Sequence, residues 1–151
     1  MAVQTRYGFG TNVGLAYPEA VTRTVALLKD EGFGVLTQID VQKTLKEKLG
    51  VEFRRYVILG ACNPPLAHRA LQAEREIGLI LPCNIIVYED GERSVVSVMD
   101  PIPALGLVGN EALRPIAEDA AARLHRVIDK LGSETAGLTT GAAAPTAPPR
   151  P

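Results

Sequence analysis

The chain has 151 residues, the size of one domain, and 16 Lys and Arg residues against 17 Asp and Glu residues give a formal net charge of -1. This balance excludes the basic footprint of a nucleic-acid-binding domain, and a chain without Trp, with 3 Phe and 4 Tyr, has no obvious base-stacking platform. No apolar run approaches the roughly 18 residues that a membrane span needs, and the first residues lack the basic start and apolar stretch of a secretory signal. We therefore expect a cytoplasmic protein without a nucleic-acid or membrane partner.

The first predicted strand covers residues 7–15, where large apolar side chains alternate with Gly or Asn. Gly8, Gly10 and Gly14 leave one face of this strand nearly bare. Glycine weakens a strand, so three on one face indicate that a helix, a second subunit or a ligand comes close to the backbone.

A helix, a strand and a short helix are predicted next. Pro18 suits the first turn of a helix that Gly32 can end, and residues 33–39 alternate as a strand. Asp40 can cap the short helix and Gly50 can end it. Its predicted inward-facing residues are Val41, Leu45 and Leu49.

The second half of the chain predicts three more strands, at residues 56–62, 83–89 and 94–100, the last two joined by a hairpin at Asp90-Gly91. One helix is expected from Pro64 to about Ile77, and the last one from Asn110 or Glu111. The fold class is thus α+β, a mainly antiparallel five-stranded sheet backed by helices. We expect a single compact domain over residues 1–131 and a flexible tail, rich in Ala, Pro, Gly and Thr, over residues 132–151.

The two cysteines each precede an asparagine, as Cys62-Asn63 and Cys83-Asn84, and each pair lies beside proline where a strand meets a turn. A two- or four-residue hairpin loop around Asp90-Gly91 places Cys83 opposite Val98 and Asp100 diagonally from Cys83. If the strands at residues 56–62 and 83–89 are antiparallel, Cys62 also lies beside Cys83. If they are joined by a parallel crossover, the cysteines lie at opposite ends of the sheet.

A site of Cys62, Cys83 and Asp100, supported by Asn63 and Asn84, could bind a soft metal ion, carry persulfide sulfur or cycle between thiol and disulfide. Cys62 immediately precedes a helix start, which can lower the pKa of a thiol. The alternative is that both thiols only pack in the core, since free cysteine is among the most buried residue types and the spacing matches no standard zinc motif.

The chain has no glycine-rich phosphate loop, no zinc-protease motif and no serine nucleophile elbow, which favours a non-enzymatic role. Besides the thiol module, two functions stay open. One is a binder of small apolar ligands with a cavity between the sheet and the last helix. The other is a structural homodimer without chemistry, joined through an exposed face or edge of the sheet.

The segments Gly60-Ala61-Cys62-Asn63-Pro64, Gly78 through Glu89, and Val98-Met99-Asp100-Pro101 resemble the bacterial and archaeal family catalogued as domain of unknown function 302. The resemblance covers about residues 7–131. It implies a compact α+β domain with an antiparallel sheet, often dimeric, and it implies no activity.

Overall fold

The computed structural model describes residues 2–136. Six strands form one sheet: β1 (Ala2–Gln4), β2 (Gly8–Val13), β3 (Gly34–Asp40), β4 (Tyr56–Cys62), β5 (Cys83–Asp90) and β6 (Arg93–Met99). The α-helices are α1 (Tyr17–Asp30), α2 (Val41–Leu49), α3 (Pro64–Ala73), α4 (Pro101–Gly106) and α5 (Arg114–Thr135), and two 3₁₀ helices are η1 (Arg75–Leu79) and η2 (Glu111–Leu113). The α+β class is therefore confirmed, with a six-stranded sheet in place of the five strands expected.

The strand order is β1-β2-β6-β5-β4-β3, and every neighbouring pair is antiparallel. The additional strand is β1, which pairs Ala2 with Thr11 and Gln4 with Phe9 at one edge. Its three residues are too few to show an alternating pattern, which is why the sequence did not reveal it.

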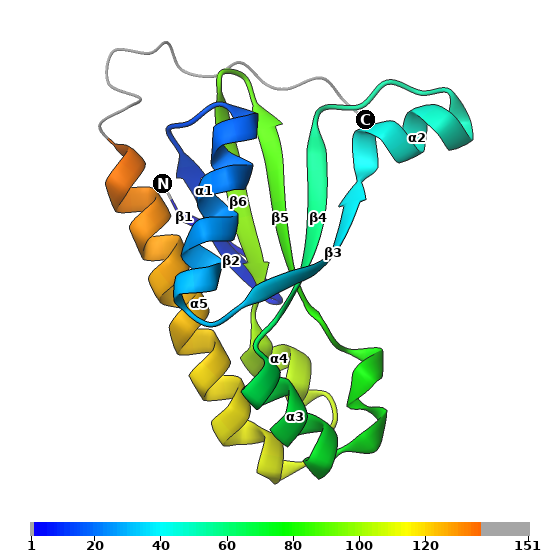
Figure 1. The fold of residues 1–151 in the computed structure, drawn as a ribbon, viewed down its shortest axis with the longest axis vertical. Coiled ribbons are helices and arrows are strands. Elements are labelled where there is room, and N and C mark those ends of the chain that lie inside the picture. Colours follow the sequence, from blue (N-terminus) through cyan, green and yellow to red (C-terminus); the bar gives the residue numbers. More distant parts are fainter. Residues whose placement is uncertain (1, 137–151) are drawn as a thin grey trace.

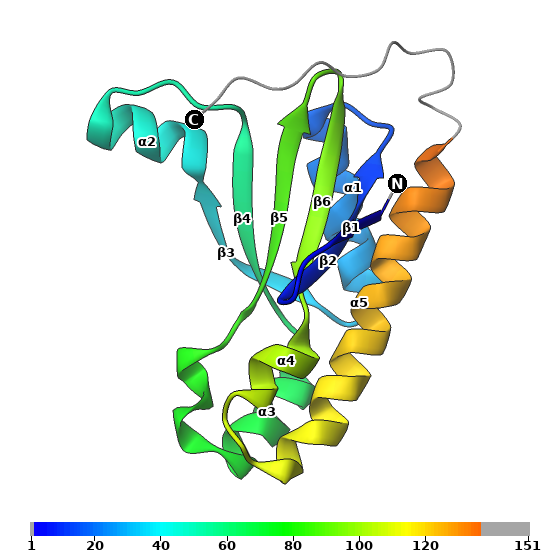
Figure 2. The same ribbon diagram turned by 180° about the vertical axis from the view of Figure 1, so that it is seen from behind.

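Helices α1 and α5 cover one face of this sheet, and within residues 2–136 no helix lies in front of β4, β5 and β6 on the other face (Figures 1 and 2). Odd-numbered residues of β4 and β5 point toward the helices, whereas the even-numbered ones point away. Of the odd-numbered set, Val57, Leu59, Ala61, Ile85 and Val87 are almost fully buried. The core of the covered face includes Val57, Leu59, Ile85, Val87, Leu27, Leu28, Leu124 and Leu131. The space between the sheet and α5 is thus packed core, not the ligand cavity that the sequence suggested there.

The β5–β6 hairpin differs from prediction by two positions. Asp90 pairs with Arg93, so the two-residue turn is Gly91-Glu92, and Gly91 takes a positive φ of 64°. Ile85, and not Cys83, therefore lies opposite Val98. The Asp-Gly signal located the turn, but its first residue belongs to the strand.

The bare glycine face of β2 is explained by its neighbour β6. A Cβ atom on Gly8 would lie 2.7 Å from the carbonyl oxygen of Val98, and one on Gly10 would collide with Ser97 and with the carbonyl of Val96. The backbone of the adjacent strand, none of the three predicted candidates, makes the close approach. A side chain at Gly10 would disturb the sheet itself.

Several helix boundaries also differ from the predictions. The helix from Pro64 ends at Ala73 and is followed by η1, while α4 begins directly after Asp100. The last helix begins at Arg114 after a single 3₁₀ turn and continues through Thr135, four residues past the predicted domain end. Thr135 is buried and its hydroxyl accepts a hydrogen bond from the Gly14 amide. The remainder of the predicted tail, residues 137–151, lies outside the described residues.

Helix α2 has the predicted ends but not the predicted packing. Asp40 accepts a hydrogen bond from the Lys43 amide at 2.9 Å, and Gly50 adopts φ 66° after the last turn. None of its residues is buried, however, and Leu49 is 69% exposed. The helix projects from the end of β3 (Figure 1), so its apolar stripe does not face the core as expected. Among residues 2–136, the helices fall short of the length and apolar character that crossing a bilayer requires.

Candidate functional site

The two cysteines lie beside each other on adjacent strands. Cys83 pairs with Ala61, so Cys62 is one residue away along β4. Because opposed α-carbons in an antiparallel pair lie about 4.5–5.5 Å apart, those of Cys62 and Cys83 are within about 7 Å. The structure therefore brings the two cysteine backbones together, as the antiparallel alternative required.

Their side chains nevertheless belong to different faces of the sheet. Cys83 shares the covered face with its partner Ala61, whereas Cys62 follows Ala61 and points to the open face beside Gly34. Both are free cysteines. Burial, and then the charge of a Cys62 thiolate, raise the pKa of the Cys83 thiol from 9.0 to about 11. Cys83 is thus protonated at neutral pH, the form that is a poor nucleophile and a poor metal ligand.

Asp100 lies directly after β6, where it begins α4. Its Oδ1 accepts a hydrogen bond from the Ile102 amide at 3.0 Å, and its own amide donates to the carbonyl of Tyr7 at 2.9 Å. This is the geometry of a helix cap. The last pair of the β5–β6 ladder is Ile85 with Val98, and the same register continued by two residues sets Asp100 opposite Cys83 and not diagonal to it. Residues 2–136 contain no group of three His, Cys, Asp or Glu side chains placed to hold a metal ion.

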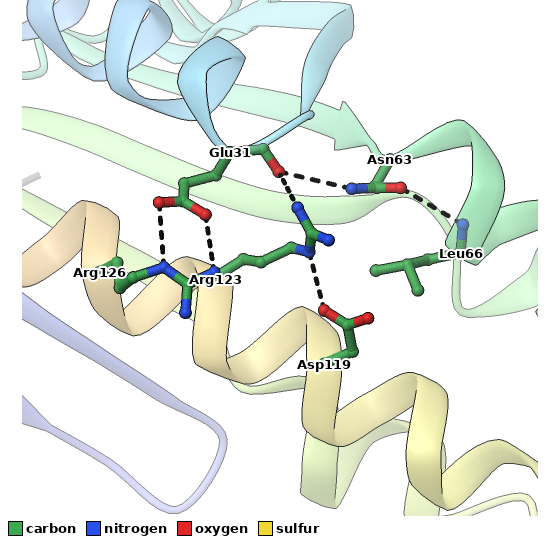
Figure 3. A network of polar contacts seen from close by, with 6 residues as sticks. All are labelled: Glu31, Asn63, Leu66, Asp119, Arg123 and Arg126. Carbon is green, nitrogen blue, oxygen red and sulfur yellow. Dashed lines mark hydrogen bonds and ion pairs between the residues drawn. The ribbon is translucent and has the colours of Figure 1, made fainter.

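Asn63 has a structural role at the start of α3. Its Oδ1 accepts from the Leu66 amide at 3.3 Å, and its Nδ2 donates to the carbonyl oxygen of Glu31 at 3.5 Å (Figure 3). The side chain lies against Gly32, where a Cβ atom would come within 2.9 Å of Nδ2. Asn63 therefore connects the start of α3 with the turn that follows α1.

The same turn is held from the other side by α5 (Figure 3). Arg123 donates to the Glu31 carbonyl at 3.0 Å and to Asp119 at 2.7 Å, while Arg126 binds both carboxylate oxygens of Glu31. Hydrogen bonding to Arg126 lowers the pKa of Glu31. This network joins the turn after α1 with α3 and α5, so it stabilises the fold.

Asn84, the other asparagine of the paired motif, is exposed and lies on the open face. It lines a groove of about 1000 Å³ that spreads over β4, β5 and β6 and ends against α4. The wall toward α4 consists of Ile80, Met99, Pro103, Ala104 and Leu107. Tyr7 and Leu107 are 75% and 83% exposed at its rim. The two Cys-Asn pairs thus lie in different surroundings, since Asn63 caps α3 and Asn84 lines the groove.

The other end of the groove is aromatic. The rings of Tyr56 and Tyr88 stack with centroids 5.4 Å apart, Phe53 lies 6.0 Å from Tyr56, and the Arg54 guanidinium lies 5.8 Å from the centre of the Tyr88 ring. Burial is the main cause that raises the pKa of Tyr56 and of Tyr88. Both hydroxyls therefore stay protonated at neutral pH and can donate hydrogen bonds.

The sequence carries a signal for this groove, namely apolar residues on both faces of β4 and β5. Tyr56 and Ile58 on β4, and Ile86 and Tyr88 on β5, are large apolar residues at the even positions that point away from the helices. A sheet face exposed to water normally carries polar residues. Apolar residues on both faces of a strand require a second covering layer or a ligand, and only the structure reveals that residues 2–136 provide no such layer over these strands.

Comparison with known proteins places these features in context. The family model described as domain of unknown function DUF302 matches residues 9–131. A crystal structure of an uncharacterized conserved DUF302 protein from Bacillus stearothermophilus superposes with a TM-score of 0.77 and 34% identity, covering 84% of this chain and 99% of that chain.

Curated relatives include the fluoride-specific ion channel FluC 1 of Brucella suis and FluC 2 of Brucella melitensis, each 33% identical over 103 residues. The matches cover 64% of this chain and 40% and 37% of those proteins. The chain therefore spans about two fifths of the length of these relatives.

Proposed function

We propose that this chain, which belongs to the family of unknown function DUF302, is a binding module that holds a small, largely apolar ligand on the open face of its sheet. The observation that carries the proposal is the groove of about 1000 Å³ over β4, β5 and β6. Ligand sites are typically concave and apolar, with a few polar groups that orient the ligand, and they reach about this size.

The residues that line the groove favour a surface that binds an apolar ligand, and not one that only faces water. Ile86, Tyr88 and Met99 present apolar surface, while Asn84 and Ser97 supply neutral polar groups between them. Apolar side chains gathered on one open face leave a patch larger than scattered surface residues would. Removing that surface from water is favourable, so an apolar ligand gains affinity without any conformational change of the sheet.

A titration with a neutral solvatochromic dye tests this function. Ile86→Glu puts a charge on the floor of the groove and should weaken dye binding by about fivefold or more, because a buried carboxylate opposes an apolar ligand. Leu71→Glu is the matched control, since Leu71 is 44% exposed on α3 outside the groove. Equal dye affinity in both variants would contradict the proposal.

A homodimer is the second candidate, and α2 with the edge strand β3 favours it. Leu36 on β3 is 68% exposed, Leu49 at the end of α2 is 69% exposed, and α2 buries no residue within the described chain. An unpaired edge strand with exposed apolar side chains is a template for pairing with another chain. A second copy that covers β3 and α2 would bury these residues.

The thiol function has less support than either of these. Its favourable feature is the adjacency of Cys62 and Cys83 across the β4–β5 ladder. Against it stands the Cys83 thiol, which burial keeps protonated with a pKa of about 11. A reactive-thiol or soft-metal role would therefore depend on Cys62.

A further inference from the structure

Aromatic side chains are concentrated in the groove. Of the 3 Phe and 4 Tyr residues in the chain, Tyr7, Phe53, Tyr56 and Tyr88 line it. Aromatic rings are large apolar surfaces that also favour particular geometries toward other rings. The groove therefore offers a ligand ring surface at one end and aliphatic surface at the end against α4.

Tyr56 and Tyr88 form an ordered wall. Their rings are nearly parallel, with an interplanar angle of 9° and centroids 5.4 Å apart, and Phe53 meets Tyr56 at an angle of 57° with centroids 6.0 Å apart. Both arrangements are within the favourable range for aromatic pairs. The guanidinium of Arg54 lies over the Tyr88 ring and is already engaged. Contacts from several sides thus hold the rings of this wall in place.

Tyr7 differs from these residues, because its ring has no aromatic partner within residues 2–136 and is 75% exposed. Its backbone is nevertheless fixed, since its amide donates to Thr5 Oγ1 at 3.2 Å and its carbonyl oxygen accepts from the Asp100 amide at 2.9 Å. A ring at a fixed position with its surface in water gains from any apolar group that covers it. Tyr7 is therefore suited to pack against a ligand.

Tyr7 and Tyr56 approach each other without touching. Burial is the main cause that raises the pKa of Tyr56, and the charges of Tyr88 and then of Tyr7 raise it further. The rings of Tyr7 and Tyr56 are not in contact, although both line the same groove. A planar ring that enters the groove can therefore pack against Tyr7 and against the wall of Tyr56 and Tyr88.

The charge of the groove favours a neutral ligand. The described residues that line it include no Asp, Glu, Lys or His, and its one arginine, Arg54, already interacts with Tyr88. Asn84, Ser97 and the protonated tyrosine hydroxyls are neutral hydrogen-bonding groups. A charged ligand would lose its hydration here without gaining an opposite charge.

We propose that the groove selects a neutral planar aromatic ligand, whose ring packs between Tyr7 and the wall of Tyr56 and Tyr88, and that Tyr7 determines this specificity. The inference rests on the proposed function, because it names the ligand class of the same groove. Contacts between aromatic rings contribute affinity beyond the area that they bury. A saturated ligand of the same size gains only from the buried area.

Isothermal titration of the full chain with 2-naphthol and with decahydro-2-naphthol tests the inference, because the two molecules share a bicyclic carbon skeleton and one hydroxyl. The aromatic ligand should bind about fivefold more tightly, the size of an aromatic contact. Tyr7→Leu should weaken 2-naphthol about fivefold and decahydro-2-naphthol less than about twofold. Tyr7→Phe keeps the ring and should stay within about twofold of wild type for both ligands.

Leu79→Ala is the control, since Leu79 is 85% exposed and does not line the groove, and it should change neither affinity. Equal affinity for the two ligands, or an equal loss of both in Tyr7→Leu, would overturn the aromatic class. If both ligands still bind wild type more tightly than Ile86→Glu, the apolar groove survives that result. Failure of both ligands to bind while the solvatochromic dye still distinguishes wild type from Ile86→Glu would overturn this inference alone. Failure of all three to bind would refute the proposed function as well.

Discussion

Replacing Asn63 with Ala should destabilise the fold far more than the same change at Asn84. Asn63 is 7% exposed and caps α3 through the Leu66 amide at 3.3 Å. Loss of an asparagine cap costs about 1 kcal/mol, within a range of about 0.5–2 kcal/mol. The bond to the Glu31 carbonyl, at 3.5 Å, is at the limit of a hydrogen bond and adds little, since Arg123 still satisfies that oxygen. We expect a total of about 1–2 kcal/mol for Asn63→Ala.

Urea unfolding followed by circular dichroism measures this difference directly. Asn63→Ser keeps a capping oxygen and should recover about half or more of the loss. Asn84→Ala changes an exposed groove residue and should cost less than about 0.5 kcal/mol. Equal losses for Asn63→Ala and Asn84→Ala, or no rescue by serine, would refute the structural role assigned to the first Cys-Asn pair.

Three further predictions concern Cys83, the end of α5 and α2. The pKa of the Cys83 thiol is about 11 in the folded state, against 9.0 for an ordinary thiol. The protonated thiol therefore contributes to the free energy of unfolding fully below pH 9.0, and this contribution is lost as the pH rises toward 11. The free energy of unfolding is measured for wild type and for Cys83→Ala at about pH 8 and about pH 11. It should fall between these two pH values by about 2 kcal/mol more in wild type than in the variant. Equal decreases in the two proteins would contradict the raised pKa of Cys83. Truncation before Gly132 should be less stable by about 1–2 kcal/mol than truncation after Ala136, because it also removes the Thr135–Gly14 hydrogen bond and the Arg23–Glu134 ion pair; equal melting temperatures would count against these contacts. For the homodimer, Leu49→Glu should shift sedimentation toward monomer while the neighbouring control Lys48→Glu does not, and a wild-type chain that sediments as a monomer at micromolar concentration would exclude it.

The sequence predicted the elements whose signals are local. β4 was expected at residues 56–62 and has those bounds. Asp40 was identified as the cap of the short helix and accepts the expected backbone hydrogen bond, and the helix predicted from Pro64 begins at that residue. Capping and turn chemistry involve residues within three or four positions of each other, so a single sequence contains all that is needed.

The predictions that were wrong concern contacts between distant parts of the chain. The stripe of α2 is apolar at Val41, Leu45 and Leu49, but periodicity does not say whether another element covers it. The hairpin register was wrong by two positions, because pairing of Asp90 with Arg93 is decided by the turn geometry. The groove was missed for the same reason, since a strand sequence does not reveal which of its faces the helices cover.

The most direct test of the central claim is a nitrogen-15 chemical-shift titration of the full chain with dodecanol, a neutral and largely apolar ligand. Binding in the groove predicts the largest amide shifts at Ile86, Tyr88, Ser97 and Leu107, on the open face and in the α4 wall. Amides along the solvent-facing side of α5 should stay unchanged. Saturable shifts confined to another part of the molecule, or no shifts at any soluble concentration of ligand, would contradict the groove as the binding site.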